Sequence, residues 1–247
     1  MKRFAIVIAA FAAFFNIAQA QNVTIVDKPV QTSAIVTSDS FVEDSAPAWR
    51  VSLQAGASYA PGKIEESDPG MYDYYKGLKW GFNYGVDVTY FPTRSWGVGV
   101  KLNDARFSNS ATGTVSYESG ETRSGTIADV INVYYAGPTA TWRWISNDNK
   151  YSLLFSYSIG YMGYYDNSKV IVPVDVKGGS LGTGLGLNFD YALSKNIALG
   201  LGVDVMSGSL RSYKVTMSGV TETINLDPGT SLGMSHLDLT AGLRFLL

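Results

Sequence analysis

The chain has 247 residues with 19 basic and 21 acidic side chains, one histidine and no cysteine. Without cysteine it can form neither disulfides nor a lipid-modified cysteine anchor, and the mildly acidic balance gives no reason to expect a nucleic-acid partner. After residue 20 no apolar run reaches the length of a membrane-spanning helix, which excludes a helical membrane protein.

Residues 1–20 have the three parts of a secretory signal. Lys2 and Arg3 precede an apolar run over positions 4–15, and the small residues of a cleavage site end at Ala20. The alternative is a membrane anchor, for which this run is too short. We therefore expect a signal peptide that is cleaved after Ala20.

Residues 21–48 are rich in Ser, Thr, Val and acids, and they include Pro29 and Pro47. This composition predicts a flexible periplasmic N-terminal segment, with a short strand over 23–26 as the alternative. The tripeptide around Ser45 matches a short acceptor pattern of bacterial O-glycosylation, which makes Ser45 a candidate modification site.

Eight segments of alternating apolar and polar residues follow, and a period of two is typical of strands with unlike faces. They cover 49–59, 80–91, 96–107, 130–144, 151–165, 181–193, 197–210 and 235–247. Three of the joins, PTRS, ISNDNK and SKN, are tight turns, whereas the other four run to about 15 to 20 residues. Short and long joins alternate, which is the layout of an outer-membrane barrel with periplasmic turns and surface loops.

The two faces of these segments differ in charge. One face carries no charge over its central span, and the other carries four acids and four bases among many glycines. The eight charged residues are Arg50, Asp87, Lys101, Arg143, Asp190, Asp204, Asp238 and Arg244. In a soluble barrel the apolar face would point inward. Aromatic residues at both ends of the segments favour instead a membrane barrel, whose apolar face meets lipid.

We therefore predict an all-β fold, a closed eight-stranded antiparallel up-and-down transmembrane β-barrel over 49–247. The last strand should pair with the first, because no open sheet edge can face hydrocarbon. Inside a lumen this narrow, the eight charged side chains are expected to neutralise one another structurally. A gate or an ion path is the alternative.

This sequence resembles the small eight-stranded outer-membrane barrels of Gram-negative bacteria, the OmpA-transmembrane and OmpX-like class. The resemblance covers 49–247 and includes the final strand, LDLTAGLRFLL, in which Leu239, Ala241, Leu243 and Phe245 keep the alternation of an assembly signal. The chain ends in Leu247 where those families have an aromatic residue. The resemblance implies an outer-membrane location, contact with outer-membrane lipid and lipopolysaccharide, and recognition by the assembly machinery through the last strand.

Motifs for catalysis are nearly absent, so we expect no catalytic, cofactor or metal site. No phosphate-binding loop or metal-ligand cluster is present, and the glycines near 178–189 miss the dinucleotide pattern. His236 adjoins Ser235, but neighbours on a strand point to opposite faces. We therefore expect a histidine at the barrel rim and not a catalytic pair.

The surface loops should carry whatever specificity the protein has. Exposed tyrosines favour binding, and the candidates are Tyr72, Tyr74, Tyr75, Tyr117 and Tyr213. Alternation within 108–129 suggests a hairpin that continues above the membrane, and 211–231 contains another alternating piece. We predict a non-enzymatic structural or surface-binding role. The alternatives are a narrow channel for small hydrophobic or ionic solutes and a lipid-modifying enzyme.

Overall fold

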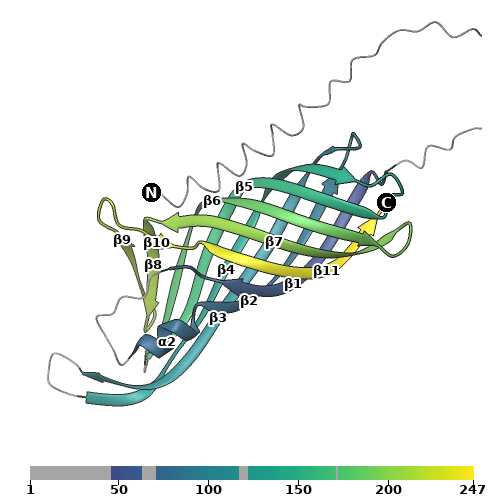
Figure 1. The fold of residues 1–247 in the computed structure, drawn as a ribbon. Helices are drawn as coiled ribbons and strands as arrows, with labels where there is room; N and C mark the ends of the chain where they lie inside the picture. The colour runs from purple at the N-terminus through teal and green to yellow at the C-terminus, as the bar shows by residue number, and fades with distance from the viewer. Residues whose placement is uncertain (1–45, 63–70, 117–121, 171) are drawn as a thin grey trace, which may run out of the picture. The chain divides into compact units, whose positions relative to one another are not determined.

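Eight antiparallel strands close into a barrel in the computed structural model, which describes residues 46–62, 71–116, 122–170 and 172–247 (Figure 1). The strands of the ring, in order, are β1 (Trp49–Tyr59), β2 (Trp80–Tyr90), β3 (Trp96–Ser116), β4 (Thr122–Ile145), β5 (Tyr151–Val170), β6 (Val172–Ala192), β7 (Ile197–Leu210) and β11 (His236–Leu246). β11 pairs with β1 along its length, from Arg50 opposite Leu246 to Tyr59 opposite Leu237. This closure confirms the predicted fold.

The apolar face of the strands points outward. On β7, Leu201 is 62% exposed, whereas the alternate residues Ala198 and Asp204 are completely buried. A belt of exposed Leu, Val, Ile and aromatic side chains around a charged interior is the reverse of a soluble barrel, and it is the arrangement of a barrel surrounded by lipid. Among the described residues no helix is long and apolar enough to cross a membrane.

Aromatic residues border this belt at both ends. Near the short turns Trp49 lies 4.8 Å from Tyr90 between ring centroids, and at the other end Tyr59 lies 4.9 Å from Trp80. Such rings favour the two headgroup regions of a bilayer. Not every aromatic residue near the segment ends belongs to this border, since Phe91 and Tyr164 are buried.

One side of the barrel is much taller than the other. β1, β2 and β11 have 11 residues each, whereas β3, β4, β5 and β6 have 20 to 24. About ten tilted residues suffice to cross the bilayer, so the upper halves of these four strands project beyond it as an open sheet. Within the described residues, 108–116 of β3 stay paired with 122–130 of β4, as expected for a raised hairpin.

Two of the expected loops have more regular structure than predicted. The prediction of a loop over 166–180 is wrong, because β5 and β6 stay paired up to Val170 opposite Val172. The segment over 211–231 contains the hairpin of β8 (Ser212–Met217) and β9 (Val220–Asn225), and β8 pairs with β6. Ser218 and Gly219 both have positive φ, as a two-residue hairpin turn requires.

Two small elements lie near the ends of the strands next to the long joins. A helix that we did not predict, α2 (Tyr72–Gly77), lies within the first long join, and β10 (Leu232–Gly233) pairs with the end of β7. Residues 1–45 lie outside the described part, and with them the expected signal peptide, Ser45 and most of the N-terminal segment.

Candidate functional site

The structure places all eight charged residues of the polar face inside the barrel, each at most 6% exposed. They come from every strand of the ring except β5, because successive strands each present their alternate residues to the lumen. They do not form one network. They divide into a lower arginine-rich group, a middle group around Lys101 and an upper group around Asp238.

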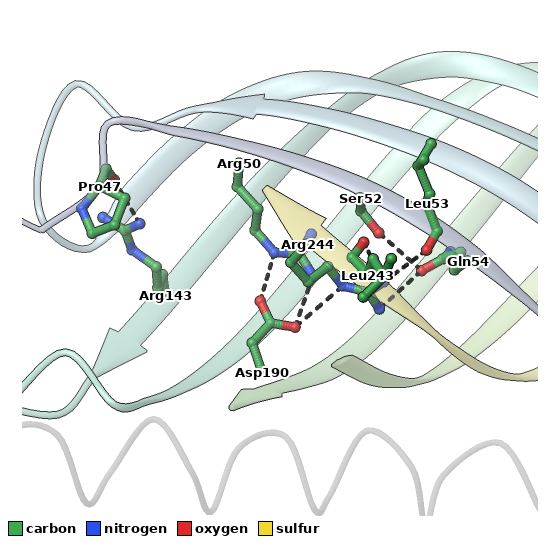
Figure 2. Close-up of polar contacts among 9 residues, drawn as sticks. All are labelled: Pro47, Arg50, Ser52, Leu53, Gln54, Arg143, Asp190, Leu243 and Arg244. Carbon is green, nitrogen blue, oxygen red and sulfur yellow. Dashed lines mark hydrogen bonds and ion pairs between the residues drawn. The ribbon is translucent and has the colours of Figure 1, made fainter. Parts of the chain in front are cut away.

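The lower group is centred on Asp190 of β6 (Figure 2). Its carboxylate accepts two hydrogen bonds from Arg50 of β1, at 2.7 and 3.0 Å, and one from Arg244 of β11, at 3.3 Å. Arg244 also donates to the side-chain oxygen of Gln54, at 3.3 Å. One carboxylate between two guanidinium groups joins strands that are not neighbours in the ring and obstructs the lumen at this level.

Arg143 of β4 is not paired with a carboxylate in the described structure, contrary to the expected pairing of all eight charges. It donates to the backbone oxygen of Pro47 at 2.8 Å (Figure 2) and to that of Arg94 at 3.1 Å. Its guanidinium carbon lies 3.7 Å from the centre of the Phe91 ring. These contacts stabilise the Arg143 charge at the end of the barrel next to the short turns.

The middle group consists of Lys101, Asp204 and Asp87. The Lys101 ammonium donates to Asp204, and Asp87 lies 3.9 Å from the same nitrogen. Two carboxylates facing one ammonium leave this level with an excess of negative charge, whereas the lower group has an excess of positive charge. The interior is therefore polarised along the barrel axis, with its positive end at the short turns.

Asp238 is the centre of the upper group and is held by hydrogen bonds from neutral donors. It accepts from the Ser58 hydroxyl and, at 3.1 Å, from the Asn103 amide. His236 lies nearby, with 3.6 Å between its Nε2 and an oxygen of Asp238. The histidine is 2% exposed, so the expected rim position is wrong. Its ring lies inside because position 236 shares the inward phase of β11.

Glycines make room for these long side chains. A Cβ built on Gly186 would collide with the carboxylate of Asp204, and one built on Gly200 would collide with the guanidinium of Arg244. Both glycines face the lumen from strands next to the charged residue. The high glycine content of the inward face is therefore a steric requirement of charged side chains in an eight-stranded barrel.

An apolar layer that the sequence analysis missed lies above the charged levels. Nine buried side chains from β3, β4, β5, β7 and the segment just before β11 form it: Ala105, Phe107, Val133, Tyr135, Met162, Tyr164, Met206, Leu210 and Met234. A usable signal existed, because the inward positions of these strands change from polar to apolar toward the long joins. We use the term apolar layer for these nine residues.

Above the apolar layer, α2 is fixed to the barrel mouth through Tyr74. Its hydroxyl donates to Asp129 at 2.6 Å, and its backbone oxygen accepts from Asn109 at 2.6 Å. Burial and the nearby Asp129 raise the pKa of the Tyr74 hydroxyl. Burial, and then Asp129, also raise the pKa of Asp166 to about 6.

The structure does not bring Ser235 and His236 together. Ser235 Oγ lies 3.5 Å from Ser207 Oγ and from the backbone oxygen of Gly208 on β7, whereas the His236 ring points into the barrel, with its Nδ1 3.0 Å from the backbone oxygen of Met234. No group of three or more His, Cys, Asp or Glu side chains suitable for a metal ion occurs among the described residues.

No protein-family model and no curated protein matches this chain. Solved structures do match it. A major outer membrane protein from Thermus thermophilus is 15% identical over 81% of this chain and 100% of that one, with a TM-score of 0.51. The outer membrane protein OprG from Pseudomonas aeruginosa is 14% identical over 83% of this chain and 98% of that one, with a TM-score of 0.48. The chain has the fold of outer-membrane β-barrels. At these identities the likeness concerns the fold alone.

The candidate tyrosines occupy different places on this outer-membrane barrel. Tyr72 and Tyr75 of α2 are 43% and 44% exposed, as expected for a binding surface. Tyr74 is buried, so its assignment as an exposed tyrosine is wrong, and it anchors the helix instead. Tyr213 is partly buried against the apolar layer. Tyr117 lies outside the described residues.

Proposed function

We propose that this protein is a non-enzymatic outer-membrane barrel with a closed lumen, which binds partners at the cell surface through its long joins, which include α2 and the β8–β9 hairpin. The observation that carries the proposal is the apolar layer. Its side chains come from several strands around the ring and pack against one another directly above the ion pairs. A lumen filled in this way serves as a rigid support, which leaves the surface as the part available for function.

The projecting parts offer suitable contact surface. Tyr72 and Tyr75 stand exposed on α2, and Met217 and Val220 are exposed beside the turn of the β8–β9 hairpin. Exposed aromatic and apolar side chains on a rigid base are typical of binding surfaces. α2 is held to the barrel by Tyr74, so its exposed tyrosines are presented in a fixed orientation.

A binding comparison on whole cells tests this function. Cells with the protein, without it, and with Tyr72→Ser/Tyr75→Ser are measured on surfaces coated with extracellular-matrix proteins. We expect attachment that depends on the protein and falls in the double variant. A matched control is Tyr90→Ser/Tyr151→Ser, which removes two exposed tyrosines at the opposite end of the barrel. Equal attachment of cells with and without the protein would refute the binding role.

Solute conduction is a second candidate, and one observation favours it. Below the apolar layer, Gln54 Nε2, Asn188 Oδ1 and Thr240 Oγ1 are buried without a hydrogen-bond partner in the described structure. Such groups suit a hydrated interior. Planar-bilayer recording separates the two functions. We expect no reproducible conductance, whereas a conductance that changes with Asp204→Asn or Lys101→Met would overturn the closed lumen.

Lipid modification has less support, because the His236 ring is buried inside the barrel, whereas Ser235, just before β11, has its hydroxyl near Ser207 and Gly208 of β7. Mass spectrometry of lipid A from cells carrying wild-type protein or His236→Ala tests it, and we expect identical lipid A.

For assembly, we infer that the outer-membrane assembly machinery recognises β11, whose outward residues Leu239, Ala241, Leu243 and Phe245 keep the alternation of an assembly signal. Replacement of Phe245 by Ser should then reduce the amount of folded protein in the membrane.

A further inference from the structure

A row of polar and basic side chains crosses the outer surface of the tall side. Consecutive strand partners in this row are Arg106, Asn132, Tyr165, Lys177, Lys214 and Thr223, on β3, β4, β5, β6, β8 and β9. Cross-strand partners share a face of the sheet, and Arg106, Lys177 and Lys214 are all exposed. We call these six residues the basic row.

The basic row lies where the outward face changes from apolar to polar. On β4 the outward residues that follow the row toward the membrane are Tyr134 and then Ala136. On β6 they are Gly179 and then Leu181, which is 69% exposed. Tyrosines favour the headgroup region of a bilayer. The three cations therefore lie at the height of the outer-leaflet headgroups.

A groove of about 820 Å³ opens along the row. Its lining includes Asp104, Tyr134, Tyr161, Tyr165, Lys177 and Lys214, together with Gly178 and Gly179. The floor of the groove is aromatic, with the rings of Tyr134 and Tyr161 6.0 Å apart and tilted by 43°, and glycines allow the close approach of these rings. A Cβ on Gly163 would collide with the ring of Tyr134, and one on Gly179 would collide with that of Tyr161. Exposed tyrosine rings beside hydrogen-bonding groups suit a sugar ring.

The acid that lines the groove, Asp104, is engaged by neutral groups. Its carboxylate accepts hydrogen bonds from the Tyr84 hydroxyl at 2.6 Å and the Asn132 amide at 3.1 Å. Lys177 and Lys214 are direct cross-strand partners, and like charges in this position repel. Neither forms an ion pair with a described carboxylate, and Lys177 lies over the ring of Tyr165 at 4.8 Å. Asp175, the acid next to the row on β6, accepts hydrogen bonds from Tyr165 at 3.2 Å and Asn167 at 3.0 Å. An anion between the two lysines would relieve the repulsion.

We propose that this groove binds the phosphorylated sugar headgroup of an outer-leaflet glycolipid, with the phosphate between Lys177 and Lys214. The sugar ring rests on the tyrosine floor. The acyl chains continue downward over Tyr161 and Leu181, which belong to the lipid-facing belt. This continuity with the belt, together with the height of the cations, identifies the ligand as a membrane lipid. The site is separate from the exposed tyrosines of α2, so either proposal can fail alone.

The test measures binding of bisphosphorylated lipid A to the detergent-solubilised full-length protein by native mass spectrometry. We expect Lys177→Gln/Lys214→Gln to weaken binding at least about tenfold, since each cation near an anionic lipid surface contributes to attraction. Lys177→Arg/Lys214→Arg should retain binding. The matched control is Lys150→Gln/Lys195→Gln, which removes two lysines from the turns at the opposite end and should bind as the wild type does.

Further probes distinguish the source of the phosphate. Dephosphorylated lipid A with the same acyl chains should bind at least about tenfold more weakly, and binding of the phosphorylated form should fall as salt is raised. Equal binding by the double variant, or by the dephosphorylated lipid, would overturn the proposal. Competition by millimolar inorganic phosphate or glucosamine 6-phosphate would do so too, because it would indicate a site for soluble anions. If the double variant does not fold, Lys214→Gln alone, in the hairpin outside the barrel ring, serves in its place.

Discussion

The lower and upper halves of the barrel interior are filled by opposite means. Below, Asp190 joins Arg50 and Arg244 through charged hydrogen bonds, and Lys101 joins Asp204. Above, nine side chains pack with little or no charge among them. Burying a charged group costs desolvation free energy, and the attraction to its partner offsets this cost only when the geometry is excellent. Burying an apolar group is favourable in itself. The comparison indicates that the lower half fixes the alignment of the strands and the upper half seals the lumen.

The largest expected effect comes from breaking the lower half. Asp190→Leu leaves the guanidinium groups of Arg50 and Arg244 buried without their carboxylate, and we expect it to lower the free energy of unfolding by about 3–5 kcal/mol. The measurement is urea unfolding of the barrel in lipid vesicles, followed by tryptophan fluorescence. Glu222→Leu, on the exposed face of β9, is the control and should change it by less than about 0.5 kcal/mol. Equal effects would show that the ion pairs are unimportant.

Both halves of the interior are enclosed by the barrel wall, whose outer face should meet lipid. A charged residue introduced on that outer face tests this placement. Leu201→Arg places a cation in the middle of the belt and should cost about 2–4 kcal/mol. Ser207→Arg lies on the same face of β7 near the outer interface, where the cost should be about 0–1 kcal/mol. Both are measured as the yield of folded protein by heat-dependent electrophoretic mobility. A cost independent of depth would contradict the membrane placement.

The upper half should respond to loss of packing and not to loss of charge. Met162 is completely buried in the apolar layer, so Met162→Ala should lower the free energy of unfolding by about 2 kcal/mol through lost contacts and a cavity. Met217→Ala, on the exposed β8–β9 hairpin, is the matched control and should have little effect. If the two variants unfold at the same urea concentration, the apolar layer does not stabilise the barrel.

The smallest effect concerns the carboxyls above the apolar layer. The pKa of Asp166 is raised to about 6, chiefly by burial and by Asp129, so the folded protein holds this proton more tightly than the unfolded chain. Stability from this group is therefore present below the unfolded pKa, near 4, and is lost as pH rises through 6. The free energy of unfolding is measured for the wild type and for Asp166→Asn at pH 5 and pH 7.5. Only the wild type should lose the contribution of this group between the two pH values. An identical pH dependence in both would contradict it.

Alternation in the sequence predicted the barrel wall well. β1 and β7 have the bounds expected, and all eight charges of the polar face lie inside. Strand ends were harder, since above the membrane both faces of β3 to β6 are polar or mixed, and lipid no longer enforces the alternation. α2 was missed because six residues are too few for a clear helical period.

The contents of the lumen were only partly predictable. The sequence shows which side chains face inward, but partners such as Arg50 and Asp190, on β1 and β6, are brought together by the curvature and stagger of the closed barrel. For the same reason, Arg143 meets an aromatic ring and backbone oxygens where a carboxylate was expected. The basic row likewise depends on the register of six strands, including β8, whose pairing with β6 has no local signal, and β9, which pairs with β8.

The most direct test of the account determines which face of the wall meets lipid. Because the chain has no cysteine, spin labels can be attached at single cysteines, at Leu201→Cys on the outward face of β7 and at Thr240→Cys on the inward face of β11. In lipid vesicles, the label at 201 should collide with oxygen dissolved in the bilayer and be shielded from a water-soluble nickel reagent. The label at 240 should be immobilised and shielded from both. Oxygen contact at 240, with nickel contact at 201, would mean that the charged face lies outside and would contradict the transmembrane barrel.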